Sequence, residues 1–259
     1  VAFASNAWLS GLGDNAWRWM LGVEAIPALF FTLLALNMAE GPRWLILKNK
    51  DLAAGEALLR RINDDLSEAE IAALVRDIEL SGERAVTSHG FFSGALRKPL
   101  MLVFLISAFN QLSGINAVLY FAPRIFEMTG LGEKAALLQS IGIGVTNLIF
   151  TILGLWMIDR LGRRTLLLIG SVGYIGSLSL CAWSFATASF TYMPYFIFAF
   201  IGAHGVGQGA VIWVFISEIC PARHRAHGTS FGVSVHWVFA AVITLLFPVF
   251  VGAVDPQYI

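Results

Sequence analysis

The sequence predicts an all-α protein that crosses a membrane several times. Of its 259 residues, 57% are hydrophobic and only 13% are charged, a balance far from that of a soluble globular domain. Two long runs contain no Asp, Glu, Lys or Arg, residues 99–123 and the 53 residues of 165–217. Because about 20 apolar residues in a helix cross a bilayer, the first run predicts one span and the second predicts two.

The remaining elements follow in chain order. Residues 1–13 indicate the end of a helix and a short loop rich in Gly, Ser and Asn. A helix is expected from Trp17, an interfacial aromatic residue, to about Met38, and Pro27 can kink it. The other expected spans are 100–122, 135–158, two within 165–217 with a turn around 188–194, and 228–252.

Residues 43–98 have the composition of a water-soluble segment and divide the chain into 1–42, 43–98 and 99–259. Ser67-Glu-Ala-Glu70 is a capping box, and apolar residues follow it at helical spacing. Residues 51–62 predict a second amphipathic helix. The segment is therefore expected to be a helical domain, although a calmodulin-type target helix, disfavoured by the mixed charges, is the alternative.

The distribution of Lys and Arg predicts the orientation. Residues 43–98 carry nine, 159–164 carry three and 223–225 carry two, whereas the opposite side carries three. Since cytoplasmic loops are enriched in positive charge, we expect 43–98, 159–164 and 218–227 to be cytoplasmic in a protein of the cell membrane. The lipid bilayer is thus an expected partner, and a net charge of zero gives no reason to expect nucleic acid.

The middle of the run 99–123 is unusually polar. It contains Asn110, Gln111, Ser113 and Asn116, with Gly114 among them. Amides at membrane depth are costly unless they face other helices or water, and a broken helix is tolerated there only where it lines a cavity. Because amides both donate and accept hydrogen bonds, they suit a neutral ligand rich in hydroxyl groups. The alternative is that they only bind neighbouring helices.

Helical spacing separates these candidates. Asn110 and Gln111 are adjacent, so they point about 100° apart and are not expected to face one partner helix together. Asn116 returns near the side of Gln111, and Tyr120 adds a hydroxyl along that side. We expect this side to contact a polar solute.

Aromatic residues and glycines mark two further spans. Trp213 and Trp237 lie inside the expected spans, whereas interfacial tryptophans lie at the ends. An indole can pack on the C–H face of a pyranose, although lipid-facing bulk is the alternative. Asn147, in the middle of another span, is a weaker candidate. The glycines at 202, 205, 207 and 209 allow close helix packing or local unwinding.

Four motifs, in order and in register, resemble those of the sugar porter family in the major facilitator superfamily. They are Asn110-Gln-Leu-Ser-Gly-Ile-Asn116 with Leu119-Tyr120 (helix seven), Asp159-Arg-Leu-Gly-Arg-Arg164 (the loop after helix eight), Trp213-Val-Phe-Ile-Ser-Glu-Ile-Cys-Pro221 with Arg225 (the end of helix ten), and Glu40-Gly-Pro-Arg-Trp-Leu45 (after helix six). The resemblance implies a major facilitator fold fragment from the end of helix five to helix eleven, with an intracellular helical domain.

The resemblance also implies a function. Members of the family transport monosaccharides by alternating access, without chemistry on the sugar and without a cofactor, and we expect the full-length protein to be a monomer. Family sugar contacts map onto Gln111, Asn116, Asn147, Trp213 and Trp237. Two positions depart from the family pattern: Asn110 and His236 each stand where a Gln is usual. Helix ten also lacks the usual proline, so the preferred sugar is left open.

A set of charged residues near the expected cytoplasmic ends is implied to pair across helices and to lock the inner side of the outward-open state. An exposed ion pair contributes only about 0–1 kcal/mol, but several suffice to bias a two-state gate. Ordinary positive-inside topology is the alternative, although it does not explain the carboxylates. The residues are Glu40, Arg43, Asp159, Arg163, Arg164, Glu218 and Arg225.

Glu24 is the candidate for proton coupling. It lies seven residues past Trp17, about 10 Å into the span, where a carboxylate is expensive and suggests function. Proton-coupled members of the family resemble this chain in carrying a glutamate in helix six. The sequence therefore predicts proton symport, with a structural role for Glu24, a facilitative uniporter or a non-transporting sugar sensor as alternatives. A membrane enzyme is disfavoured, because the five histidines lack metal-ligand spacing on one helix.

Overall fold

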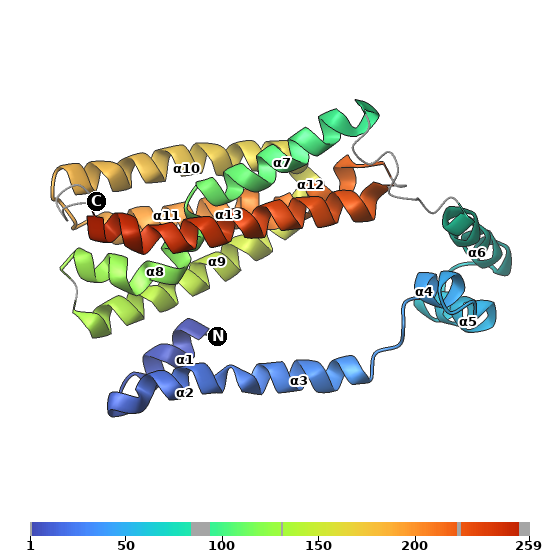
Figure 1. Cartoon of the computed structure of the whole chain (residues 1–259), viewed down its shortest axis with the longest axis horizontal. Coiled ribbons are helices and arrows are strands. Elements are labelled where there is room, and N and C mark those ends of the chain that lie inside the picture. The colour runs from blue at the N-terminus through green and yellow to red at the C-terminus, as the bar shows by residue number, and fades with distance from the viewer. Residues whose placement is uncertain (1, 84–93, 131, 222–223, 254–259) are drawn as a thin grey trace. The chain divides into compact units, whose positions relative to one another are not determined.

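The structure is a computed structural model of the chain, and it describes residues 2–83, 94–130, 132–221 and 224–253 (Figure 1). Within these ranges every regular element is a helix. Six helical segments are long and apolar enough to cross a membrane: 16–36, 97–128, 138–161, 163–186, 193–219 and 225–250. The predicted all-α, multi-pass architecture is confirmed.

Contacts divide the chain into two units, residues 1–23 with 93–259, and residues 24–92. The predicted division at 42/43 and 98/99 differs from this one, because the helix Ala25–Leu36 (α3) has no buried residue and makes few contacts. Part of the predicted domain 43–98, residues 84–93, lies outside the described residues, as do 222–223 and 254–259.

The run 99–123 forms a broken helix, as predicted. Helix α7 (Arg97–Leu112) ends at Ser113, and α8 (Ile115–Met128) begins after Gly114. Gly114 has φ +80°, a left-handed conformation that residues with a Cβ adopt only at a cost. Pro123 lies inside α8, and Phe121 just before it departs from helical dihedral angles. The segment continues six residues past the predicted end at Ala122.

Three further helical segments belong to the same unit. Helix α9 (Glu133–Leu161) and α10 (Arg163–Ala186) are joined at Gly162, which also has a positive φ. The predicted turn around 188–194 separates α10 from α11 (Met193–His204). Helix α13 (Arg225–Ala253) runs alongside α7 (Figure 1). These helices begin two to three residues before their predicted starts, which is the usual uncertainty at helix ends.

The glycines after α11 form a widened turn and a close helix crossing. Residues Gly205–Gly209 are a π-helix (η3), followed by α12 (Ala210–Ile219). A methyl group on Gly154 of α9 would lie 2.8 Å from the carbonyl oxygen of Val206, and one on Gly205 would lie 2.9 Å from the backbone nitrogen of Thr151. Local unwinding and close packing therefore occur together here.

The N-terminal segment contains α1 (Ala2–Leu9), η1 (Gly13–Asn15) and α2 (Ala16–Val23), and α1 packs on α9. The helix expected at 17–38 is interrupted at Glu24, between α2 and α3. Pro27 explains the break, since it has no N–H for the carbonyl of Val23 and its ring crowds that carbonyl. As predicted, Pro27 disturbs this helix, and the interruption lies one turn before the proline, at Glu24.

The other unit contains a small helical core built by α4 (Pro42–Leu47), α5 (Leu52–Ile62) and α6 (Glu68–Glu83). Ile46, Leu59, Ile71 and Val75 are buried together, one or two from each helix. The amphipathic stripes expected at 51–62 and after residue 67 therefore pack on each other. Helix α4 was not predicted, because six residues give no detectable periodicity.

The predicted capping box is confirmed. The Ser67 backbone N–H and hydroxyl donate to the Glu70 carboxylate at 2.8 and 2.7 Å, and the Glu70 N–H donates back to the Ser67 hydroxyl. These hydrogen bonds hold the pKa of Glu70 below its ordinary value, the hydroxyl contributing most. Asp51 caps α5 by accepting from the N–H of Ala54 at 2.9 Å.

Candidate functional site

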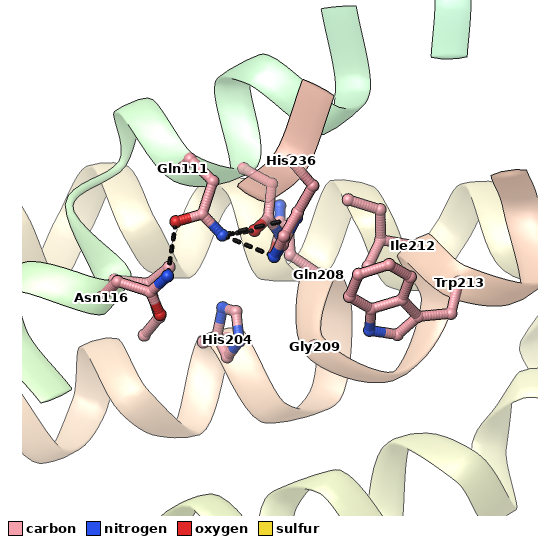
Figure 2. Close-up of a pocket in the computed structure, with 10 residues that line it drawn as sticks. Gln111, Asn116, His204, Gln208, Gly209, Ile212, Trp213 and His236 are labelled. Atoms are coloured by element: carbon pink, nitrogen blue, oxygen red, sulfur yellow. Dashed lines mark hydrogen bonds between the residues drawn. The ribbon is translucent and has the colours of Figure 1, made fainter. Parts of the chain in front are cut away.

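A polar pocket with a cavity volume of about 70 Å³ lies between the helices of the larger unit (Figure 2). This volume is well below the range of about 300–1,000 Å³ that is typical of ligand sites. No Asp, Glu, Lys or Arg is among the described residues that line the pocket. Those residues are Asn110, Gln111, Ile115, Asn116, His204, Gln208, Gly209, Ile212, Trp213 and His236.

Gln111 is the centre of the polar network in the pocket. Its side chain is 1% exposed, its Nε2 lies 2.8 Å from Nε2 of His236, and its Oε1 accepts from Nδ2 of Asn116 at 2.9 Å. The same Nε2 donates to Oδ1 of Asn110 at 3.3 Å. Nε2 of Gln111 also lies 3.4 Å from Nδ1 of His236, so both ring nitrogens of this histidine face the amide nitrogen. Figure 2 shows these side chains converging from separate elements.

The break at Gly114 brings the amides together. In a continuous helix, Asn116 would lie about 140° around the axis from Gln111, so the expectation that helical spacing alone returns it to that side was wrong. The turn at Ser113 and Gly114 redirects α8, so that Asn116 returns within hydrogen-bonding distance. Asn110 lines the pocket as Gln111 does. Its buried Nδ2 has no hydrogen-bond partner among the described residues.

The other predicted contacts are divided between the pocket and its surroundings. Trp213 lines the pocket, with its ring centroid 4.7 Å from that of His236. Trp237 and Tyr120 are 54% and 56% exposed and do not line it. Asn147 does not line it either, although its Oδ1 is buried without a partner in the described part of the chain. Sugar contacts by these three residues stay predictions.

Several residues that line the pocket were not predicted from the sequence. His204 and Gln208 are the polar ones, and Ile115, Gly209 and Ile212 complete the wall. Gln208 donates to the hydroxyl of Ser171 at 3.1 Å, which attaches η3 to α10. One sequence feature could have identified His204 and Gln208. Both lie inside a charge-free run of 53 residues, where polar side chains need hydrogen-bond partners.

One group of the predicted charged residues is assembled in the structure. Arg163 donates to Glu218 from Nη2 at 3.0 Å and from Nε at 3.1 Å, and to Asp159 from Nη1 at 3.2 Å. This cluster links the ends of α9, α10 and α12. In the described ranges, no ion pair involves Arg164 or Arg225. Glu40 and Arg43 belong to the other unit.

Glu24 lies at the break between α2 and α3, and its side chain is exposed. Within the described residues it forms no ion pair. The carboxylate thus lies inside a span of 21 residues, Ala16–Leu36.

The fold and the pocket define a class of protein. Spanning helices that surround an uncharged, hydrogen-bonding pocket beside a broken helix form the kind of site that membrane transporters build from discontinuous helices. The comparisons with known proteins agree. The family described as "Sugar (and other) transporter" matches residues 1–259, and the chain belongs to this family.

Individual relatives are named for sugars. The chain is 31% identical over 250 residues to "Glucose transporter GlcP" of Staphylococcus epidermidis, covering 95% of this chain and 55% of the relative. It is 32% identical over 244 residues to the "D-xylose-proton symporter" of Escherichia coli K12, covering 92% and 48%. A solved structure of the proton:xylose symporter XylE bound to 6-bromo-6-deoxy-D-glucose superposes with a TM-score of 0.80 at 29% identity, covering 99% of this chain and 56% of XylE. The chain thus spans about half the length of these relatives.

Proposed function

We propose that the intact protein carries a monosaccharide across the membrane by alternating access and couples this movement to protons. The observation that carries the proposal is the hydrogen-bonded set of Gln111, Asn116 and His236 at a helix break inside a membrane-spanning unit. The relatives are transporters and not enzymes, and their names include a glucose transporter and a xylose–proton symporter.

The chemistry of the pocket supports a neutral, hydroxylated ligand. Asn110 and Asn116 offer amide groups, and Trp213 offers an aromatic face for the C–H face of a sugar ring. Because no charged side chain lines the pocket, an ionic ligand would lose its hydration without gaining a counter-charge. A monosaccharide fits both requirements.

The gate is assigned to the cluster of Asp159, Arg163 and Glu218. A bidentate contact between arginine and carboxylate holds a defined geometry, but these side chains are partly exposed to solvent, so the pairing is weak. A weak lock of this kind suits a protein that must alternate between two states separated by a few kcal/mol. The expected cytoplasmic side of 159–164 places this lock on the inner side.

Transport in proteoliposomes tests the proposal. Glucose, xylose and arabinose are offered to the intact protein, and counterflow and uphill uptake are measured with and without an inward proton gradient. We expect counterflow of at least one of these sugars, and accumulation only with the gradient. Binding without flux would identify a sensor instead, and counterflow without gradient-driven accumulation would identify a facilitative uniporter.

A further inference from the structure

We infer that His204, held in place by Tyr174, contacts one particular hydroxyl group of the sugar and thereby sets which sugars the pocket accepts. The inference rests on the proposed sugar site. It adds to that site a specificity-determining side chain on the wall opposite Gln111, together with a positioning residue behind it.

The geometry of the pair comes first. His204 ends α11 and lines the pocket, whereas Tyr174 lies in α10, is buried and does not line it. The hydroxyl oxygen of Tyr174 lies 2.5 Å from Nδ1 of His204, and the two ring planes are 3° apart. The Tyr174 ring also packs against Phe200, with centroids 4.8 Å apart, which restricts its motion. Tyr174 does not line the pocket, so it affects a ligand through the side chains that it contacts, and of His204 and Phe200 only His204 lines the pocket.

The hydrogen bond determines which group His204 offers to the ligand. A neutral imidazole carries one proton, and the bond made by one nitrogen sets the role of the other. We assign the phenol as the donor to Nδ1, which places the imidazole proton on Nε2, so that His204 presents an N–H donor to the ligand. His236 differs from it, because both of its ring nitrogens face Nε2 of Gln111.

The free edge of His204 lies at the pocket wall. A methyl group on Gly209 would lie 3.0 Å from both Nε2 and Cδ2 of His204, so glycine at this position leaves that edge uncovered. Figure 2 shows the His204 ring on the side of the pocket away from Gln111 and His236, with Asn116 beside it. A ligand that hydrogen-bonds to Gln111 or Asn116 therefore has its far side toward His204.

A fixed donor aimed at one hydroxyl group discriminates strongly. A site built to hydrogen-bond a substrate hydroxyl rejects an analogue that lacks it, since the polar group of the protein is then left unpaired. The Tyr174 bond holds the ring, so Nε2 does not turn to find another partner. Sugars that differ only at this hydroxyl are therefore the ones that the pocket distinguishes.

Binding of deoxysugars tests the inference. Glucose and its monodeoxy derivatives are titrated by tryptophan fluorescence against the intact wild-type protein, His204→Phe and Tyr174→Phe, with the exposed Tyr195→Phe as the matched control. In the wild type, we expect one deoxy position to weaken binding by about tenfold. His204→Phe should bind glucose about three- to tenfold more weakly and no longer distinguish that position. Tyr174→Phe should reduce the discrimination at the same position, and Tyr195→Phe should leave it unchanged.

The pattern across sugars separates the possible outcomes. A loss of discrimination at a single position in either variant supports the inference, because a merely structural role would weaken all sugars by the same factor. A uniform loss, or an unchanged profile, overturns it while leaving the sugar site intact. If His204→Phe does not fold, the Tyr174→Phe profile decides. Absence of binding by every sugar in the wild type would instead contradict the proposed function.

Discussion

Gln111 uses every polar group of its side chain inside the protein. Its Nε2 donates to Asn110 and contacts His236, and its Oε1 accepts a hydrogen bond from Asn116. A sugar hydroxyl can join such a network because hydroxyl groups both donate and accept. Truncation of Gln111 leaves His236 and Asn116 without these partners, so its effect exceeds the loss of one contact.

The prediction at this scale is that Gln111→Ala weakens sugar binding by about tenfold or more, since each unpaired buried group costs about 1–3 kcal/mol. Tryptophan fluorescence titration of the intact protein measures it. Gln139→Ala is the matched control, because Gln139 lies in α9 and does not line the pocket. Wild-type affinity in the Gln111→Ala protein would count decisively against this site.

At the residue scale, the sequence predicted the amides but not their neighbours. Amides in a charge-free run indicate a polar site, and Gln111, Asn116 and His236 do meet. The spacing argument for Tyr120 assumed that one face continues along the helix, but the side chain lies one turn beyond Asn116, outside the pocket. The pairing of Tyr174 with His204 joins residues 30 positions apart on different helices, which no local pattern specifies.

At the scale of elements, Gly114 illustrates how backbone geometry shapes the site. Its positive φ ends α7 and restarts α8, and a Cβ there would meet no atom within 4 Å. The requirement for glycine is thus conformational and not steric. Gly176, inside α10, also has open space around it but has ordinary helical geometry, which makes it a matched comparison.

We therefore expect Gly114→Ala to destabilise the protein by about 1–2 kcal/mol, the cost of a left-handed residue with a Cβ, and to weaken sugar binding. Gly176→Ala should be neutral or slightly stabilising, because alanine is the better helix former. Thermal unfolding and sugar titration of both variants provide the measurement. Equal effects of the two substitutions would show that the break at Gly114 does not shape the site.

The predictability of an element depended on its length and on its backbone. The spans were recognised because long apolar runs leave few alternatives, and Pro27 and Gly114 marked the breaks. Glycines at 205, 207 and 209 indicated close packing or unwinding, and η3 combines the two. Helix α4 has only six residues, too few for a recognisable hydrophobic pattern. It is stabilised by its burial against α5 and α6.

At the scale of the whole molecule, Arg163 connects three helices through two carboxylates. Because the cluster lies apart from the residues that line the pocket, a change there should affect the conformational step and not the sugar contacts. A residue of the gate is therefore expected to change the rate of counterflow but not the affinity for sugar, whereas a binding residue changes the affinity.

Glu218→Gln should accordingly slow sugar counterflow several-fold while the affinity for sugar changes less than about twofold. The substitution removes the charge facing Arg163 but keeps the shape, and Asp159 still pairs with the arginine. Glu127→Gln is the control, since Glu127 forms a local ion pair with Arg124 three residues away. If affinity and counterflow fall together in Glu218→Gln, the cluster is not a gate.

Proton coupling is a property of the whole molecule, and Glu24 is the residue on which we propose that it depends. The side chain lies at the break that Pro27 imposes within a span of 21 residues, where a carboxylate is costly and suggests a function. We expect Glu24→Gln, which keeps the shape of the side chain but has no carboxylate to carry a proton, to abolish accumulation driven by a proton gradient while sugar counterflow continues. Uptake of radiolabelled sugar into proteoliposomes, with and without the gradient, measures both activities, and Glu127→Gln should behave as wild type in each. Uphill uptake that persists in Glu24→Gln would assign Glu24 a structural role and place the coupling group elsewhere.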